Sequence, residues 1–414
     1  MIELERNTED YLPSGWSLCR LKDVVSCNDE SLPETTSEDL EIEYVEIGNV
    51  NEADGITSVS HYRFGDAPSR ARRITRKNDV IISTVRTYLK AIAEIDRDGL
   101  IVSTGFAVLR PNGKVRPSFL HYAVQSNDLL EEVIKESTGI SYPAIQASRL
   151  LSLPVVVPPL DEQLKIAEYL DSKLVSINSL LRIKQKVLGK LKLFRQVKVD
   201  EVITHGLRAN VSMKDSGEKW LGAVPAHWVV GRIGSFFEER REQVSDTEYP
   251  PLSVTKQGVF PQIEGVAKTD NGENRKKVCI GDFVINSRSD RKGSSGVSKY
   301  EGSVSLINIV LTSNSSILPD FCNYLFKSHR FIEEYYRVGH GIVADLWTTG
   351  FNDMRTINIA VPPLDEQKEI TAYLDSECEK IDQKCALIEQ QIEKLQLLKR
   401  ALINEVVTGK RRIQ

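Results

Sequence analysis

Two stretches of this chain concentrate arginine and lysine, whose side chains bind phosphate groups and base edges. Residues 63–90 hold eight basic and two acidic residues, a net charge of 8 − 2 = +6. Residues 268–299 hold eight basic and four acidic residues, a net charge of 8 − 4 = +4. Hydroxyl and amide side chains interleaved with them can bond phosphate oxygens, and an arginine fork matches guanine O6 and N7. The chemistry that these residues favour is recognition of DNA.

A basic run taken alone is more often a solvated surface than a binding site. Here the chain consists of two halves related by the internal repeat described below, and a basic run occurs at the corresponding place in each half. This correspondence favours the binding interpretation. The candidate DNA-binding residues are Arg70, Arg72, Arg73, Arg76, Lys77, Arg86 and Lys90 in the first stretch, and Arg275, Lys276, Lys277, Arg288, Arg291 and Lys292 in the second.

Residues for bond-breaking chemistry are harder to find. Asp161, Glu162, Asp365 and Glu366 could suggest a nuclease, but they begin predicted helices, where acids meet the positive end of the helix dipole. The six histidines are scattered, and the sequence has no G-x-x-x-x-G-K-[ST], H-E-x-x-H or C-x-x-C pattern. We therefore expect no catalytic residue, no metal site and no cofactor bound by this chain.

The chain contains an internal repeat. The sequence VPPLDEQ occurs at 157–163 and again at 361–367, an offset of 204 residues. Tyr-Leu-Asp-Ser follows each copy in the same register, and a Pro-x-x-Trp motif stands near the start of each half, at Trp16 and Trp228. The repeat predicts two globular units, each followed by a long segment.

The long segments, 161–205 and 365–407, are predicted to be helices because apolar residues recur in steps of three or four. Each helix would be ~65 Å long at about 1.5 Å per residue, and Gly206 and Gly409 stand where a helix stop is expected. Ordinary core helices of a bundle are the alternative, which this length disfavours. We expect the two helices to pack antiparallel on each other through Ile166, Leu170, Ile177, Leu181, Leu188, Leu191, Leu374, Ile381, Ile388, Ile392, Leu395 and Leu402.

The globular units alternate short β-like runs with helical patterns, which predicts an α+β class with small mixed sheets. The fold expected is two α/β-type globular domains separated by a pair of long antiparallel coiled-coil helices, with a pseudo-two-fold internal repeat. The predicted strands include 80–83, 100–103, 106–109 and 283–285, and the helical patterns cover 117–135 and 319–337. The predicted parts are two recognition domains at 1–158 and 209–362, and two helical regions at 159–208 and 363–414.

Composition limits the possibilities further. Lys plus Arg is 54 and Asp plus Glu is 58, so the net charge of −4 excludes a uniformly basic coat and leaves local patches. The first residues lack the apolar core of a signal peptide, and no apolar run approaches the ~20 residues that cross a bilayer. We expect a soluble, cytoplasmic protein with reduced cysteines.

With its duplication, its strand-VPPLDEQ-helix junctions and its divergent flanking units, the sequence resembles a specificity subunit of a type I restriction-modification system. The marks of this resemblance are 153–163 and 357–367, each followed by Ile-x-x-Tyr-Leu-Asp, and the stretch from Thr138-Gly139 to Leu150. The second copy of that stretch, from Gly339 to Met354, is a looser match.

The resemblance implies that each globular unit reads one half of a split, asymmetric DNA target and that the helices set the spacing between the halves. It further implies that the chain has no catalytic activity of its own. Its partners would be double-stranded DNA, two methyltransferase subunits and, through them, restriction subunits, with S-adenosylmethionine, ATP and magnesium held by those partners. The alternative is a non-catalytic coiled-coil scaffold of another DNA-associated complex.

Overall fold

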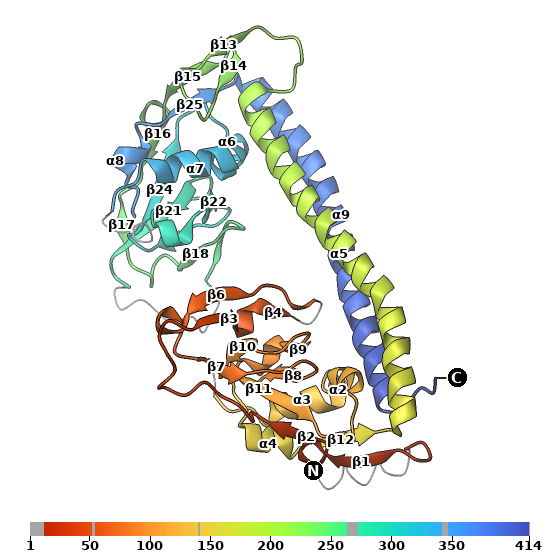
Figure 1. The fold of residues 1–414 in the computed structure, drawn as a ribbon. Coiled ribbons are helices and arrows are strands. Elements are labelled where there is room, and N and C mark those ends of the chain that lie inside the picture. The colour runs from red at the N-terminus through yellow and green to blue at the C-terminus, as the bar shows by residue number, and fades with distance from the viewer. Residues whose placement is uncertain (1–11, 52–53, 140, 263–271, 342–346, 414) are drawn as a thin grey trace. The chain divides into compact units, whose positions relative to one another are not determined.

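The computed structural model describes residues 12–51, 54–139, 141–262, 272–341 and 347–413 (Figure 1). Its contacts divide the chain into two compact units. Unit 1 comprises residues 1–186 and 389–414, and unit 2 comprises residues 187–388. Each long helix contributes to both units, so the expected four-part division is not tested by this partition and stays a prediction.

Unit 1 is built on two four-stranded sheets, with the orders β2-β11-β8-β9 and β6-β3-β10-β7. Its central strand β8 is buried on both faces: Val80 and Ile82 enter one core while Ile81 enters another, as the two-residue side-chain period of a strand requires. Pairing is antiparallel except between β10 and β3. The strands are β1 (Ser17–Arg20), β2 (Val25–Cys27), β3 (Glu41–Val45), β4 (Val50–Asn51), β5 (Gly55–Ile56), β6 (Ser60–Arg63), β7 (Ala71–Ile74), β8 (Val80–Ser83), β9 (Ile92–Glu94), β10 (Ile101–Ser103), β11 (Phe106–Pro111) and β12 (Pro154–Val157).

Unit 2 repeats this plan. The sheet β16-β24-β21-β22 has the order of β2-β11-β8-β9, and the pair β15-β25 matches the pair β1-β12. A three-stranded sheet, β17-β20-β23, and the pairs β13-β14 and β18-β19 complete it. The strands are β13 (Met213–Asp215), β14 (Ala223–Pro225), β15 (Val229–Arg232), β16 (Phe237–Glu239), β17 (Gln243–Val244), β18 (Leu252–Val254), β19 (Val259–Pro261), β20 (Arg275–Val278), β21 (Phe283–Asn286), β22 (Ser295–Val297), β23 (Gly302–Val304), β24 (Asn308–Ser313) and β25 (Asn358–Val361).

Each predicted helical stretch between the strands is two helices in the structure. The first is α2 (Pro117–Ala123) and α3 (Asn127–Lys135), and the second is α6 (Pro319–Lys327) and α7 (His329–Arg337). The breaks have the same cause, because the hydroxyls of Ser126 and Ser328 accept hydrogen bonds from the backbone N–H groups of Leu129 and Phe331 and so cap the second helix of each pair. Two short helices, α4 (Ala147–Leu151) and α8 (Phe351–Met354), precede the last strands.

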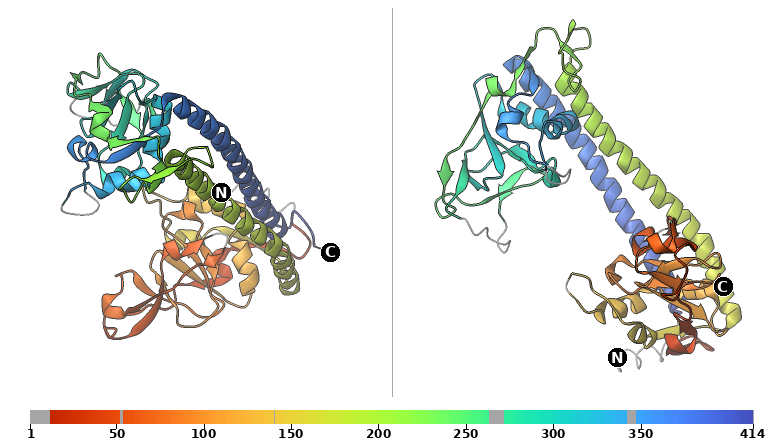
Figure 2. Two further views of the ribbon diagram at one scale, coloured as in Figure 1. Left: turned by 90° about the horizontal axis from the view of Figure 1, so that it is seen from above. Right: turned by 60° about the vertical axis from the view of Figure 1, so that its left-hand side comes forward.

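The long helices are α5 (Leu160–His205) and α9 (Leu364–Val407), and they run side by side (Figure 2). In unit 1, Ile166 of α5 shares a core with Ile403 of α9, and further along α5 Lys184 Nζ donates to Gln391 Oε1 at 2.6 Å. The residue numbers rise on α5 as they fall on α9.

The same reversal occurs in unit 2. Arg195 Nε of α5 lies 2.9 Å from Asp382 Oδ1 of α9, while Ile203 shares a core with Ile370. The helices are therefore antiparallel within each unit, as the sequence predicts. No helix of the described residues is long and apolar enough to cross a membrane.

The residues predicted to pack the helices together differ in burial. Side chains are buried where a globular core covers the helix or where the other helix lies closest. The remaining side chains are half-buried because the contact surface between two paired helices is narrow. The buried ones are Ile166, Leu170, Leu181, Leu374, Ile381 and Leu402, and the half-buried ones are Ile177, Leu188, Leu191, Ile388, Ile392 and Leu395.

Candidate nucleic-acid interface

The glutamine of each VPPLDEQ motif fixes the start of a long helix to its globular unit. Gln163 is fully buried; its amide nitrogen donates to the carbonyl oxygens of Pro158 at 2.8 Å and Lys114 at 3.2 Å, and its oxygen accepts from the backbone N–H of Arg116 at 2.7 Å. Gln367 makes the same set of bonds in unit 2, to Pro362, Ser316 and Leu318. The motif is repeated because both junctions satisfy the same buried backbone groups.

The glutamates of the motif bind the segment that carries the Pro-x-x-Trp motif. Glu162 Oε2 accepts from Trp16 Nε1 at 2.8 Å, and Glu366 Oε2 lies 2.7 Å from His227 Nε2. In each unit, the end of the long helix that does not start there lies against the tryptophan of that unit's Pro-x-x-Trp motif. After α9 the chain passes so close to this motif that a Cβ at Gly409 would lie 2.7 Å from Pro13 Cδ and 3.1 Å from Trp16, and the φ of Gly409 is +76°. Each of these carboxylates thus holds the Pro-x-x-Trp segment of its own unit, and no group of side chains able to hold a metal ion occurs in the described ranges.

The predicted basic residues of strand β7 lie on or beside one edge of unit 1. The side chains of Arg70 and Lys77 are exposed, and the guanidinium of Arg72 lies over the ring of Phe64, 4.6 Å from its centroid. Arg73 is half-buried, and Arg76 pairs with Glu30 at 2.5 Å. Arg70, Arg76 and Lys77 are therefore the exposed cations of this group.

The corresponding residues on β20 of unit 2 are held by the protein itself. Arg275 is buried, and its Nε donates to Ser303 Oγ at 2.8 Å. Lys276 Nζ bonds Glu239 at 2.9 Å, and Lys277 Nζ bonds Glu242 at 3.0 Å. The structure gives Arg275 a role inside the protein, so we leave it out of the interface proposed below.

The loop after β8 carries the other predicted cations of unit 1, and it is paired with a second loop from far along the chain. Val85 forms a β-bridge with Ala144, and the N–H of Arg86 donates to the carbonyl of Pro143 at 2.7 Å. The Arg86 guanidinium lies 4.8 Å from the centroid of the exposed Tyr142 ring. Arg86 and Lys90 bracket the 3₁₀ turn η4 (Thr87–Leu89), and both adopt left-handed backbone conformations, with φ of 53° and 49°.

The loop after β21 is the counterpart in unit 2. Arg288 forms a β-bridge with Thr348, and the N–H of Ser289 donates to the carbonyl of Trp347 at 2.9 Å. The turn η6 (Ser289–Arg291) follows. Arg288 Nε lies 3.0 Å from Asp290, Lys292 Nζ lies 2.8 Å from Glu333, and both cations remain partly exposed. Residues 342–346, which precede Trp347 in the sequence, lie outside the described residues.

A family model described as "Type I restriction modification DNA specificity domain" matches residues 13–188. Residues 13–188 are therefore similar to the specificity domain of type I restriction-modification systems. The match covers the globular part of unit 1 and extends into α5. It includes the first VPPLDEQ junction and the two paired loops, 84–90 and 138–146.

Similar proteins extend over more of the chain than this match does. The putative type I restriction enzyme MjaX specificity subunit of Methanocaldococcus jannaschii is 25% identical over 341 residues, which are 78% of this chain and 75% of the relative. A solved chain from a study of complex assembly and conformational transition of the type I R-M system covers 97% of this chain and 99% of that chain, at 23% identity and a TM-score of 0.70. That likeness shows a shared fold. The HsdS subunit of Thermoanaerobacter tengcongensis aligns over 97% of this chain and 98% of that chain, at 24% identity and a TM-score of 0.44.

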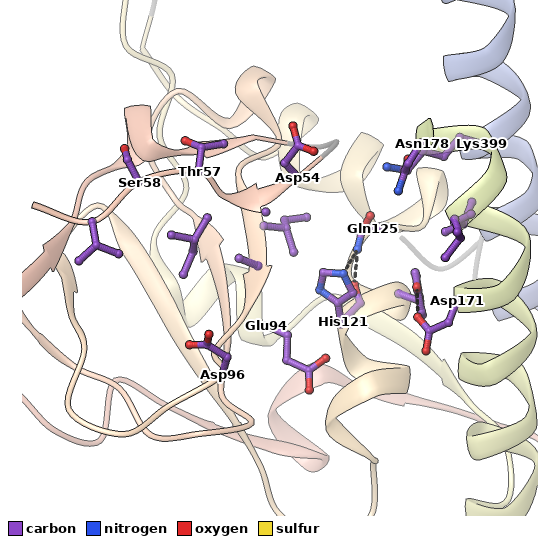
Figure 3. Close-up of a pocket in the computed structure, with 18 of the residues that line it drawn as sticks. Asp54, Thr57, Ser58, Glu94, Asp96, His121, Gln125, Asp171, Asn178 and Lys399 are labelled. Atoms are coloured by element: carbon purple, nitrogen blue, oxygen red, sulfur yellow. Dashed lines mark hydrogen bonds between the residues drawn. The ribbon is translucent and has the colours of Figure 1, made fainter. Parts of the chain in front are cut away.

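Unit 1 also has a polar cavity of about 730 Å³ between α2, β9 and α5 (Figure 3). His121 and Gln125 lie at its wall, and Gln125 Nε2 donates to His121 Nε2 at 2.9 Å. Burial lowers the pKa of His121 to about 4, so its ring is neutral at pH 7. The cavity presents no nucleophile and base in contact, and we assign it no chemistry.

Sequence reasoning missed the exposed aromatic and aliphatic side chains of the paired loops. Tyr88, Leu89 and Tyr142 are 54%, 42% and 60% exposed, and Trp347 is 36% exposed. A signal exists for the first three, because Tyr88 and Leu89 lie within the first basic run and Tyr142 lies in the stretch from Thr138-Gly139 to Leu150 that carries the family resemblance. Only the fold brings the two loops together.

Proposed function

We propose that this chain is the DNA-reading subunit of a type I restriction-modification complex. Unit 1 reads one half of a bipartite, asymmetric target and unit 2 reads the other half. The bound chain directs methyltransferase subunits, and through them restriction subunits, to that target in the cytoplasm. It performs no catalysis itself, and S-adenosylmethionine, ATP and magnesium belong to its partners.

One observation carries this proposal. Both units hold an arginine-bearing loop after a central strand, β8 or β21, and both bridge that loop to a second loop ahead of the last strand. The side chains of the two turns differ: η4 reads Thr-Tyr-Leu, whereas η6 reads Ser-Asp-Arg. A shared scaffold with different surface residues is what two readers of unlike sequences need, because base edges are discriminated by side-chain type.

The length of the helices supports a fixed spacing between the two half-sites. Helix α5 has 46 residues and α9 has 44, and both run without interruption. A continuous helix of that length spans ~65 Å at about 1.5 Å per residue, which is enough to set a separation on the scale of the ~34–36 Å helical turn of DNA.

Mapping of methylated bases in the host genome tests the proposal. We expect one bipartite motif, with two unlike halves and a fixed spacer, to lose methylation when this gene is deleted and to regain it when the gene is restored. A methylation pattern that does not depend on the gene would contradict the proposal. Filter binding of the purified chain to duplex DNA tests the scaffold alternative, for which no sequence preference is expected.

A test of the non-catalytic assignment uses the purified full chain alone. Incubated with duplex DNA, magnesium and S-adenosylmethionine, it should neither cleave nor methylate the DNA. Product formation that persists through further purification would show an activity of its own and would contradict this part of the proposal.

A further inference from the structure

We propose that each unit reads thymine methyl groups through exposed apolar side chains beside its arginine loop: Tyr88 and Leu89 in unit 1, and Leu306 and Ile307 in unit 2. This inference rests on the proposed function and names residues that determine specificity at its site. The four side chains are 54%, 42%, 40% and 45% exposed. In both units a pair of exposed apolar side chains lies beside an arginine-bearing loop, so the two units share a mixed apolar and cationic surface.

In unit 1, the apolar pair stands at the tip of a rigid turn. The N–H of Leu89 donates to the carbonyl of Arg86 at 2.8 Å, and the N–H of Lys90 donates to the carbonyl of Thr87 at 3.1 Å. The buried Thr87 hydroxyl lies 2.9 Å from Ser137 Oγ, which ties the turn to the second loop. Tyr88 and Leu89 are therefore held outward in a defined position.

The backbone around this tip is strained. Arg86 and Lys90 lie in the left-handed region at φ 53° and 49°, which residues with a Cβ adopt rarely and at a cost in free energy. Such conformations persist where surrounding contacts enforce them, and they gather at functional sites. Here they place a cation on each side of the two apolar side chains.

In unit 2, the apolar pair comes from a different part of the same scaffold. Leu306 and Ile307 form the turn between β23 and β24, and the N–H of Ser287 donates to the carbonyl of Ile307 at 3.3 Å, which places this turn against the loop that begins at Arg288. The N–H of Asn308 donates to the carbonyl of Ser305 at 3.0 Å and closes the turn.

The corresponding turn of unit 1, Thr104-Gly105, carries no large apolar side chain. It contains Gly105, whose carbonyl accepts from the N–H of Thr84 at 2.8 Å, and a Cβ at Gly105 would lie 2.7 Å from Ile47 Cδ1. The apolar pair has therefore changed place between the two units, from the η4 tip to the β23–β24 turn, while its nearness to an arginine loop is kept.

The thymine methyl group explains why apolar and cationic side chains occur together. In the major groove this methyl is the apolar feature among hydrogen-bonding edges, while guanine O6 and N7 accept the arginine fork. A docking surface for another protein would also use exposed apolar residues, but each pair lies beside an arginine: Arg86, with Lys90, in unit 1, and Arg288, which also contacts Asp290, in unit 2. The mixture fits a thymine beside a guanine in each half-site.

The experiment compares Leu89→Ser with Ile307→Ser in the full chain, with each variant serving as the control for the other. In the host, Leu89→Ser should relax one or two positions in one half of the methylated motif and leave the other half intact, and Ile307→Ser should do the reverse. Leu40→Ser, at a leucine of unit 1 that is 43% exposed and lies outside the loop, should leave the motif unchanged.

A second measurement compares the affinity of the wild-type chain for duplexes that contain thymine or uracil. Uracil, which lacks the methyl group, replaces each thymine of a matched duplex in turn, and the affinity of the wild-type chain should fall about 5-fold or more at one thymine per half-site. At the thymine of its own half-site, Leu89→Ser should show no further loss with uracil.

The possible failures are distinguishable. A wild-type chain that yields no bipartite motif would refute the proposed function. A bipartite motif that survives both variants unchanged, or duplexes that bind equally with thymine and uracil at every position, would overturn the present inference and leave the proposed function standing. Thermal unfolding of both variants near the wild-type temperature excludes misfolding as the cause of a relaxed motif.

Discussion

The hydroxyl of Tyr122 donates a 2.5 Å hydrogen bond to Oδ1 of Asp171, and this bond joins α2 of the globular part of unit 1 to α5. Unit 2 has the same relationship between Tyr324 on α6 and Asp375 on α9, at 2.6 Å. Burial and the adjacent carboxylate raise the pKa of both tyrosines, which therefore stay protonated donors at neutral pH. The two helix junctions thus use the same tyrosine–aspartate hydrogen bond. In both, the aspartate is the third residue of the repeated Tyr-Leu-Asp-Ser sequence.

Replacement of Tyr122 by phenylalanine should weaken unit 1 while keeping its packing. A hydrogen bond to a charged acceptor contributes about 1.5–3 kcal/mol, and because Asp171 is exposed and can be rehydrated we expect a loss of about 1–2 kcal/mol in the free energy of unfolding. Urea denaturation of the full chain measures it. Tyr324→Phe is the matched variant in unit 2, and a change below about 0.3 kcal/mol in both would show that these bonds do not anchor the helices.

The sequence predicted elements better than the contacts between them. Periodicity indicated the long helices because apolar residues such as Ile166 and Leu374 recur in steps of three or four, and the internal repeat indicated that the two helices pack antiparallel. The role of Gln163 was not visible, since its partner Lys114 lies 49 residues earlier in the chain. The burial of Arg275 was missed for the same reason: its partner Ser303 comes from another strand. Pairings of this kind depend on tertiary structure, which a local pattern of charge does not report.

His121 should make unit 1 less stable in mild acid. Burial lowers the pKa of the folded ring to about 4, below its ordinary value near 6.5, so the unfolded chain binds more protons between these pH values. The stability is fully present above about pH 6.5 and is lost as the pH falls toward 4. Asp171 raises and Lys399 lowers the pKa of His121, and nearby Glu94, whose own pKa is raised by burial, contributes in the opposite direction.

A comparison with His121→Gln isolates this effect, because Glu94 and Lys399 remain in both proteins. From pH 7 to pH 4 the free energy of unfolding of the wild type should fall by about 2–3 kcal/mol more than that of the variant. Urea denaturation at a series of pH values measures it. A difference that stays constant across this range would mean that His121 is protonated in the folded protein as readily as in the unfolded chain.

Arg86 and Lys77 should differ in the way their loss affects DNA binding. Arg86 is stacked on Tyr142 and fixed by its loop, which suits a base contact, so Arg86→Ala should cost ~1–3 kcal/mol and relax one position of the half-site. Lys77 is an exposed cation, and Lys77→Ala should weaken all sequences alike and lower the salt dependence. Binding to matched and single-mismatch duplexes at two salt concentrations separates the cases. Equal effects of Arg86→Ala on every duplex would make Arg86 a phosphate contact.

The length of the paired helices should set the preferred spacer between the half-sites. Four residues inserted after Gly189 in α5, with four after Ile388 in α9, add ~6 Å at about 1.5 Å per residue, which corresponds to about two base pairs of DNA. The insertion turns the helix by about 40° beyond one full turn, so we expect the optimum to move by one to three base pairs with both half-sites unchanged. Methylation of plasmids with graded spacers measures the optimum. The same four residues placed in the loop after Gly206, outside the helix, should leave it where it was, and an unchanged optimum in the helix variant would remove the helices from the determination of the spacer.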